Sequence, residues 1–371
     1  MEKITIIGGG NGGFAAAADL TIRGHQVTLY DSPAFAAGLQ PVIEQGGINL
    51  RTLPSNGLQG GFAKVYKVTT DIEEALAESD IVLVIAPAYA QANIAKTMAP
   101  HLRDGQIVAL CPANFGGSLY FNKVLRDIGC TTKVQFAEFS CMMYATRKDG
   151  PAGSYVRGYK HNLGVAMFPN KNSDWAFERL KGIYPYIIRY NNIVETGMSN
   201  TNTTLHTSLM LLNAANIDNH EDRLFYAECV TQSLDHLIEA TDKERMQVNV
   251  WPKMNVRSIP KITLDWYAYQ GGEGETLSEI QHALVPKIFF ESKMPKTLDY
   301  RYVTEDVPFG LIPIAAFLEQ MGFKHRAISA LADILGYIMD RDFYKEARTM
   351  EELGIEKMNA EEFMQFLEEG N

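Results

Sequence analysis

Three residues of this chain have the types and the surroundings for proton transfer and carboxylate binding: His206, Asp306 and Arg301. His206 lies four residues after Asn202 in a segment with helical periodicity, so their side chains should share one helix face. An aspartate within hydrogen-bond distance of a histidine fixes the ring tautomer and favours its protonated form, which gives a general acid/base near neutral pH. Asp306 is the candidate for that position. Arg301 could bind a carboxylate through two parallel hydrogen bonds.

Each of these residues also has a purely structural interpretation. A lone buried histidine is more often satisfied by a backbone carbonyl than used in chemistry. The segment 299–310, which sets an arginine and carboxylates before a helix-starting proline, could be a solvated loop in which Arg301 and Asp306 pair only with each other. The residue types alone leave both interpretations open.

Near the N-terminus, a short apolar strand leads directly into a glycine turn and a helix start. Gly8, Gly10 and Gly13 fit the pattern G-x-G-x-x-G, with Asn11 and Gly12 inside it. In that pattern the first glycine allows a sharp turn, the second allows the backbone to approach a pyrophosphate, and the third allows the helix to pack on the strand. The N–H groups at the helix start favour bound phosphate. The turn therefore predicts a dinucleotide-binding domain.

A second apolar strand, 26–30, ends in Asp31, where a carboxylate should accept hydrogen bonds from the adenine ribose hydroxyls. A carboxylate there repels a 2′-phosphate, and Ser32 does not supply the positive charge that NADP would require. The expected cofactor is therefore NAD, with NADP less favoured. The competing interpretation is a tight turn followed by a solvated aspartate.

Strand and helix signals alternate over residues 1–192, as in parallel α/β units, and the chain then becomes helical over 193–371. We therefore expect a Rossmann domain followed by an all-α domain. Two more apolar strands are followed by Pro87 and by the segment 112–117. Loops at the carboxyl ends of parallel strands line the ligand crevice of such sheets, so both segments should border the cofactor groove.

In the second half, apolar residues recur at helical intervals in two long segments, 202–237 and 311–343. The section 251–274 contains prolines and a Gly-Gly pair, which predicts an irregular excursion. Near the C-terminus, Phe363 and Phe366 should pack a short acidic surface helix onto the rest of the domain.

The composition excludes several classes of partner. The 371 residues suit two domains, and 46% hydrophobic with 21% charged residues is typical of a globular protein. Lys plus Arg at 34 against Asp plus Glu at 44 gives −10, so neither nucleic acid nor an anionic membrane is an expected partner. The four cysteines lack C-x-x-C spacing, which argues against zinc and disulfides, and no metal is expected. Without a signal peptide or membrane span, a cytoplasmic protein is expected, with small-molecule partners and a homodimer as one assembly open to it.

With these motifs in place, the chain resembles the octopine/nopaline (opine) dehydrogenase family over nearly its whole length. The matching segments include Arg301-Tyr302 with Glu305 to Pro313, which is far more specific than the glycine turn. The other matching segments are 8–13, 112–117, 137–138, 204–206 with 213–214, and 353–354.

The resemblance implies a Rossmann domain, then an all-helical domain like the C-terminal domain of 6-phosphogluconate dehydrogenase, with the substrate site in the cleft between them. It implies NAD(P)H-dependent reductive condensation of an amino acid with a 2-oxo acid, pyruvate being favoured, and the reverse oxidation. By motif position, His206 would relay the proton, Asp306 would orient it, Arg301 would bind a carboxylate and Asn202 would lie near the reacting centre. Glu138 would receive the amino group, unless it is a strand-end carboxylate in solvent.

Two other functions stay open at this stage. One is a NAD-dependent 2-hydroxyacid or 3-hydroxyacyl dehydrogenase of the same two-domain build, which would also use a histidine–carboxylate pair. The other is a dinucleotide-sensing protein without turnover. The first would reduce its oxo substrate without an amine, and the second would oxidise no NADH.

Overall fold

The computed structural model describes residues 1–370, which form two compact units. Unit 1 comprises residues 1–113 and 117–189, and unit 2 comprises 114–116 and the chain from 190 onward. The boundary predicted at residue 192 lies three residues beyond the end of unit 1, and the prediction placed 114–116 in the first domain, whereas they cluster with unit 2. These three residues belong with the helical unit because the Phe115 ring packs on Phe317 at 5.1 Å and its backbone oxygen accepts a hydrogen bond from Arg348 (2.8 Å). Asn371, the last residue of the expected second domain, lies outside the described residues.

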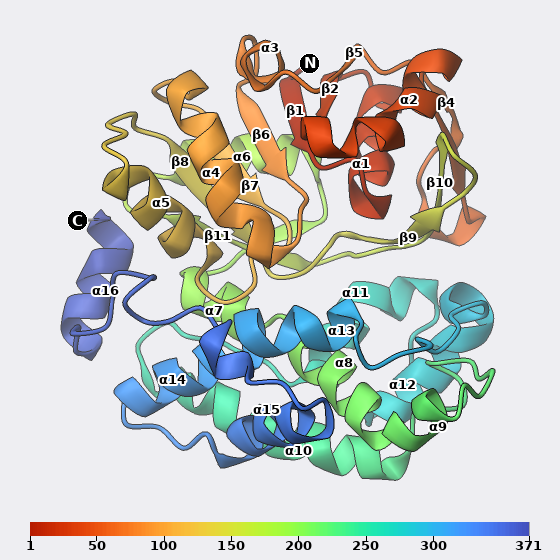
Figure 1. The fold of residues 1–371 in the computed structure, drawn as a ribbon, viewed down its shortest axis with the longest axis vertical. Helices are drawn as coiled ribbons and strands as arrows, with labels where there is room; N and C mark the ends of the chain where they lie inside the picture. Colours follow the sequence, from red (N-terminus) through yellow and green to blue (C-terminus); the bar gives the residue numbers. More distant parts are fainter. Residues whose placement is uncertain (371) are drawn as a thin grey trace. The chain divides into compact units, whose positions relative to one another are not determined.

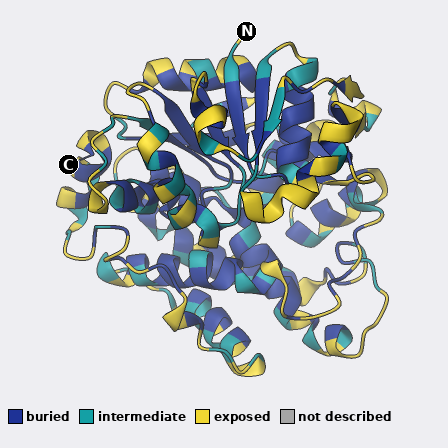
Figure 2. Ribbon diagram, turned by 45° about the horizontal axis from the view of Figure 1, so that its top comes forward, coloured by how far each residue is buried: buried dark blue, intermediate teal, exposed yellow. Residues whose placement is uncertain are grey.

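Unit 1 is built on an eight-stranded sheet with the order β12-β11-β8-β7-β6-β1-β2-β5 (Figure 1). Six of its strands, from β5 to β8 in that order, run parallel, as the alternating pattern predicted. The strands of this sheet are β1 (Lys3–Ile7), β2 (Gln26–Tyr30), β5 (Lys67–Thr69), β6 (Ile81–Val84), β7 (Ile107–Leu110), β8 (Gln135–Phe139), β11 (Leu163–Phe168) and β12 (Ile187–Arg189). The central strands are buried on both faces, and Figure 2 shows them in dark blue.

The sheet is mixed rather than purely parallel, because β11 runs antiparallel to β8. Between these two strands the chain leaves the main sheet to form part of a second, four-stranded sheet with the order β4-β3-β10-β9. The chain returns without the helical crossover that a parallel connection would need. The strands of the second sheet, which the sequence did not predict, are β3 (Ile48–Thr52), β4 (Gly61–Ala63), β9 (Tyr144–Lys148) and β10 (Gly153–Tyr159).

Helix α1 (Asn11–Ile22) is enclosed by unit 1 on all sides. It packs beside β1 and β2 of the main sheet and also against all four strands of the second sheet. Its residues from Gly13 to Leu20 are buried, including four consecutive alanines, which a helix with a single apolar face would not require. The other helices of unit 1 are α2 (Ala36–Gln45), α3 (Ile72–Leu76), α4 (Gln91–Met98), α5 (Gly117–Asp127) and α6 (Asp174–Ile183).

Unit 2 is helical over its described residues apart from short turns and one isolated β-bridge, Leu224 to Lys293. Its helices are α7 (Ile193–Met198), α8 (Thr201–Leu212), α9 (Ala214–Asp218), α10 (Gln232–Arg245), α11 (Ile259–Tyr267), α12 (Leu277–Leu284), α13 (Arg301–Thr304), α14 (Ile312–Gln320), α15 (Arg326–Ile338) and α16 (Ala360–Glu369). Helices α8, α10 and α15 pack on one another, and α13 packs on α8, which brings the ends of two distant segments together (Figure 1).

The structure corrects two details of the second half. The long helical segment expected at 202–237 is broken after α9, and residues 219–231 form turns before α10 begins. The section 251–274 is not wholly irregular, because it contains α11. Pro260 lies in the first turn of that helix, where its missing N–H has no helical partner to lose, so the proline starts the helix rather than interrupting it. The packing of Phe363 and Phe366 on α16 is confirmed, since both are buried.

Candidate active site

The glycine turn between β1 and α1 has the steric requirements of a close helix–strand contact. A Cβ on Gly13 would lie 1.7 Å from the backbone oxygen of Gly8, and one on Gly8 would lie 2.3 Å from that of Ile85. Gly8 also has φ +118°, a backbone conformation that residues with a side chain rarely adopt. By contrast, a Cβ on Gly10 would have nothing within 4 Å, so this side of the turn is open for a ligand to approach the backbone.

Asp31 is fixed against this turn by two hydrogen bonds. Its Oδ2 accepts from the backbone N–H of Gly9 and its Oδ1 from that of Ser32, both at 2.8 Å. The carboxylate is therefore held beside the start of α1, where no side chain caps the first N–H groups. A dinucleotide fits this arrangement, with phosphates at the helix start and the adenine ribose at Asp31. Asn11 and Gly12 are the first two residues of α1, and Pro87 follows β6 at the same carboxyl edge of the sheet.

Glu138 is buried on β8, with no exposed surface. Its Oε1 accepts hydrogen bonds from the backbone N–H and the hydroxyl of Ser118, both at 2.7 Å, in the first turn of α5. A negative charge at a helix start is stabilised by the free N–H groups and the helix dipole. The alternative that Glu138 is a solvated strand-end carboxylate is therefore wrong.

In unit 2 the structure places His206 and Asp306 side by side. The His206 Nδ1 lies 2.9 Å from the Asp306 Oδ2, and the two residues are 8% and 7% exposed. His206 is on α8, whose N-cap is Asn200, and Asp306 follows α13 directly before a π-helical turn at Val307–Leu311. Because a carboxylate only accepts hydrogen bonds, the His206 Nδ1 donates its proton to Asp306. The other ring nitrogen, Nε2, is then the atom that can exchange a proton with a substrate.

Two tyrosines complete the surroundings of the imidazole. The Tyr302 ring stacks on the His206 ring with centroids 3.8 Å apart and an interplanar angle of 22°. The Tyr226 hydroxyl lies 3.3 Å from the His206 Nε2. Tyr226 was not predicted from the sequence, because it lies in the turns before α10 and has no periodic signal there. Tyr302 was predicted only as part of the family motif.

Arg301 is the first residue of α13, and its partner is not the one considered from the sequence. Its Nη2 lies 3.0 Å from the Oε2 of Glu305, one helical turn later, whereas Asp306 faces His206. The interpretation in which Arg301 and Asp306 pair only with each other is therefore wrong. The pKa of Arg301 is raised above its usual value: partial desolvation of the guanidinium opposes this rise, but the charges of Glu305 and Asp306 and the neighbouring tyrosines outweigh it. The Arg301 side chain is 57% exposed, so its guanidinium can reach a ligand.

Asn202 and Asn213, also on or next to α8, differ in their surroundings. Asn202 is half-buried one turn before His206, and its backbone N–H donates to Asn200 Oδ1 at 3.2 Å. Asn213 is buried at the end of α8, and its Nδ2 donates to the backbone oxygens of Leu209 (2.9 Å) and Cys229 (3.3 Å). Asn213 therefore joins α8 to the turns that carry Tyr226.

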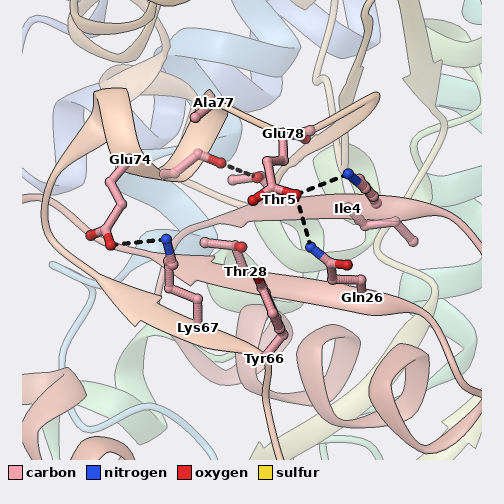
Figure 3. Close-up of a pocket in the computed structure, with 12 residues that line it drawn as sticks. Ile4, Thr5, Gln26, Thr28, Tyr66, Lys67, Glu74, Ala77 and Glu78 are labelled. Carbon is pink, nitrogen blue, oxygen red and sulfur yellow. Dashed lines mark hydrogen bonds and ion pairs between the residues drawn. The ribbon is translucent and has the colours of Figure 1, made fainter.

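A small pocket of about 60 Å³ lies at the amino-terminal edge of the parallel strands, opposite the glycine turn (Figure 3). Thr5 of β1 lines the pocket. The charged side chains that line the pocket form two ion pairs, Lys3 with Glu78 and Lys67 with Glu74, each at 2.9 Å. The pocket is too small for a dinucleotide and lies at the wrong edge of the sheet for one.

Further features bear on the expected chemistry. Among residues 1–370, no cluster of three or more His, Cys, Asp or Glu side chains could hold a metal ion.

None of the helices described has the length and apolar character needed to cross a bilayer. None of the four cysteines forms a disulfide bond in the described part of the chain, and burial raises the pKa of the Cys111 thiol, just after β7, to about 12, which keeps it neutral and poorly nucleophilic.

Comparison with known proteins decides the family. Residues 189–339 match the family described as NAD/NADP octopine/nopaline dehydrogenase, alpha-helical domain, and residues 3–113 match the NAD-dependent glycerol-3-phosphate dehydrogenase N-terminus. The chain is 30% identical over 360 residues to an opine dehydrogenase of Arthrobacter sp. (strain 1C), covering 97% of both proteins. The chain belongs to the opine dehydrogenase family. It is thus an NAD(P)-dependent oxidoreductase acting on CH–NH donors, in the family whose reaction condenses an amino acid with a 2-oxo acid.

A further relative matches nearly the whole chain, and two solved structures share its fold. The chain is 22% identical to vitopine synthase of Allorhizobium ampelinum (strain ATCC BAA-846 / DSM 112012 / S4), covering 96% of both chains. An octopine dehydrogenase structure, in complex with NADH and agmatine, superposes with a TM-score of 0.74 at 18% identity, covering 92% of this chain and 90% of that one. D-mandelate dehydrogenase with NADH and anilino(oxo)acetate has a TM-score of 0.61 at 13% identity, covering 91% and 98%, so the fold alone does not separate the two reactions.

Proposed function

We propose that the chain catalyses NADH-dependent reductive condensation of the amino group of an amino acid with a 2-oxo acid, pyruvate being the first candidate, and the reverse oxidation of the secondary amine. The observation that carries the proposal is the buried His206–Asp306 pair, 2.9 Å apart, in a chain of the opine dehydrogenase family. The pair supplies a general acid/base, and Arg301 supplies a carboxylate-binding group on the same segment as Asp306.

Formation of the imine from the amino acid and the 2-oxo acid needs two kinds of proton transfer. An ammonium group must lose a proton before its nitrogen can attack the 2-oxo carbon, and the oxygen that leaves as water must gain protons. The nitrogen available for these transfers is the His206 Nε2, because Nδ1 is engaged by Asp306. Asp306 stabilises the imidazolium each time His206 takes up a proton, and the stacked Tyr302 ring fixes the plane of the imidazole. The Tyr226 hydroxyl can donate to Nε2 while the ring is neutral.

The remaining site residues hold the substrates. Arg301 is proposed to bind a substrate carboxylate with its exposed guanidinium. Asn202, one turn before His206 on α8, is proposed to hydrogen-bond a substrate near the reacting carbon. Glu138 is proposed to receive the amino group. Glu138→Gln, which keeps the shape of the side chain, should then raise the KM for the amino acid, whereas a lower Tm with unchanged KM would leave Glu138 with only the structural role described above.

The cofactor is proposed to be bound by the glycine turn and Asp31, with NADH preferred over NADPH. Gly8, Gly10 and Gly13 shape the turn, and the backbone of Asn11 and Gly12 at the start of α1 would meet the phosphates. Pro87, at the carboxyl edge of the sheet, would border the bound dinucleotide. When bound, the reduced nicotinamide supplies the hydride.

The deciding experiment is a matrix of amino acids against 2-oxo acids, in which NADH oxidation is followed by absorbance and the products are identified by mass spectrometry. The expected result is NADH oxidation only where both substrates are present, with a product mass equal to that of the secondary amine dicarboxylate. Undiminished reduction of a 2-oxo acid without amine would instead establish a hydroxyacid dehydrogenase, whose fold D-mandelate dehydrogenase shares. A flat trace across the whole matrix would support a dinucleotide sensor.

The finer expectations on partners and place are also proposals. We propose a cytoplasmic enzyme that binds neither nucleic acid nor membranes, supported by the net charge of −10 and by the four cysteines, which form no disulfide bond in the described structure. A homodimer is the proposed assembly, and analytical ultracentrifugation of the purified chain would measure it directly, a single species of monomer mass being the contrary result.

A further inference from the structure

A continuous set of side-chain contacts in unit 2 joins Arg301 to the start of the helix that carries His206. The Arg301 Nη2 lies 3.0 Å from Glu305 Oε2, and Asn114 Nδ2 donates to Glu305 Oε1 at 3.4 Å. Asn200 Nδ2 then donates to Asn114 Oδ1 at 2.8 Å. Finally, Asn200 Oδ1 accepts from the backbone N–H of Asn202 at 3.2 Å, as the N-cap of α8.

Glu305 is the buried charged residue of this set, next to the equally buried Asn114 and Asn200. Its side chain is only 4% exposed, whereas that of Arg301 is 57% exposed. A buried carboxylate is stable only where charges or hydrogen-bond donors compensate it, and the Arg301 guanidinium, in ion-pair contact at 3.0 Å, supplies one such charge. The ion pair favours the guanidinium orientations that keep Nη2 beside Glu305, a preference that an unpaired surface arginine would not have.

Position 114 imposes two requirements, on backbone conformation and on side-chain hydrogen bonding, that few residue types besides asparagine meet together. Its backbone lies in the left-handed region, with φ +57°, which asparagine tolerates better than most residues. It is 4% exposed, and its amide group is used at both ends, as a donor to Glu305 and as an acceptor from Asn200. Asn114 lies in the segment after β7, 112–117, which was predicted to border the cofactor groove.

We propose that Glu305 and Asn114 are positioning residues of the reaction: they orient Arg301 for the substrate carboxylate and tie it to the start of α8, and therefore to His206. This inference rests on the proposed function, because it presupposes that Arg301 binds a substrate carboxylate. It adds a physical reason for the polar residues around Arg301, which contribute no group to the proton transfer.

Glu305→Gln tests the proposal, because glutamine keeps the volume and an oxygen for Asn114 but removes the charge that holds Arg301. The expected result is a rise of about tenfold or more in the KM for the 2-oxo acid or the amino acid, with a smaller change in kcat, since misorientation of a binding group by about 1 Å can cost up to two orders of magnitude. The affinity for NADH, measured by fluorescence, should not change. An unchanged KM with a lower Tm would overturn the proposal, and so would a lower KM, which would mean that Glu305 only neutralises the arginine.

Asn114→Asp provides a second variant, because aspartate tolerates the same backbone and keeps the acceptor for Asn200. It places a carboxylate oxygen against Glu305 in place of the N–H donor, so the same rise in KM is expected, and an unchanged KM would count against Asn114. The matched control is Glu239→Gln on α10, which removes an ion pair of the same i, i+4 spacing with Lys243 (2.7 Å). Both of its side chains are exposed, so no kinetic change is expected there.

Arg301→Ala and the double variant Arg301→Ala/Glu305→Gln separate this inference from the function on which it rests. If Glu305 acts through Arg301, the double variant should have the same KM as Arg301→Ala alone. Additive effects would overturn the positioning role while leaving Arg301 in place. If Arg301→Ala itself leaves both KM values unchanged, the failure lies in the proposed role of Arg301.

Discussion

Asp306→Asn should separate the electrostatic contribution of the His206–Asp306 pair from its packing. Asparagine keeps the volume and can present an oxygen to Nδ1, so the tautomer and the stacking on Tyr302 can persist while the negative charge is lost. A hydrogen bond to a charged group contributes about 1.5 to 3 kcal/mol. Because both residues are at least 92% buried, with 8% and 7% exposed, solvent screens this bond only weakly.

That free energy, expressed at about 1.4 kcal/mol per factor of ten, predicts a fall in kcat of roughly 10- to 150-fold if the imidazolium forms fully in the transition state. For comparison, two unit charges about 4 Å apart at an effective dielectric of about 20 interact by about 4 kcal/mol, which sets the upper limit near a thousandfold. His206→Ala should cost roughly two to four orders of magnitude. In His206→Ala/Asp306→Asn, the second change should add little, because the aspartate acts through the ring.

The assay is steady-state NADH oxidation at saturating substrates, with the NADH affinity and the Tm measured for each variant. Asp299→Asn is the matched control, because that carboxylate lies in the same part of the chain but is 75% exposed, with Arg341 at 3.4 Å. A kcat for Asp306→Asn within a factor of two of the unmodified enzyme, with an unchanged Tm, would refute the reasoning. It would mean that the pair only packs the helices.

Three further predictions concern the carboxylate, the cofactor and the fold. Arg301→Lys keeps the charge but loses the two parallel hydrogen bonds, so a KM for one substrate should rise roughly tenfold; unchanged KM values with a lower Tm would make Arg301 structural. NADH should give a higher kcat/KM than NADPH, and Asp31→Asn should narrow that ratio; equal activity with NADPH in the unmodified enzyme would contradict the assignment. Gly13→Ala, whose Cβ would lie 1.7 Å from a backbone oxygen, should destabilise the fold by about 1 to 3 kcal/mol in urea unfolding, whereas Gly38→Ala, with nothing within 4 Å, should change stability little or raise it slightly.

The sequence predicted the parts of the fold that have a strong local pattern. The glycine turn, the buried parallel strands and the helical second half follow from motif and periodicity, and the structure has all three. The second sheet was missed because its strands are short and lie far apart in the chain: β3 pairs with β10 across about a hundred residues. Helix α11 was missed because Pro260 was interpreted as a breaker, although a proline is tolerated in the first turn.

A site residue was predictable from the sequence only where its own segment carries a motif. His206 and Asp306 were proposed as partners from residue type and family motif, and the structure places them 2.9 Å apart. Glu305 as the partner of Arg301 could have been found from their i, i+4 spacing, had a helix been predicted to start at 301 instead of after the proline. Tyr226 carries no such signal, because tertiary packing of an irregular segment brings it to the imidazole.

The spacing within the segment 301–307 explains how one short helical stretch can present both an exposed arginine for a carboxylate and an aspartate that contacts His206. At about 100° per residue, Glu305 lies nearly above Arg301 and holds its guanidinium, while Asp306 is turned roughly 140° away from Arg301. Asp306 therefore faces His206 while Arg301 stays exposed. Val303 and Val307, both fully buried, anchor the stretch to the core on the remaining side. The group proposed to bind a carboxylate and the residue proposed to orient the acid/base are thus fixed by the same backbone, so we expect a shift of this stretch to disturb substrate binding and proton transfer together.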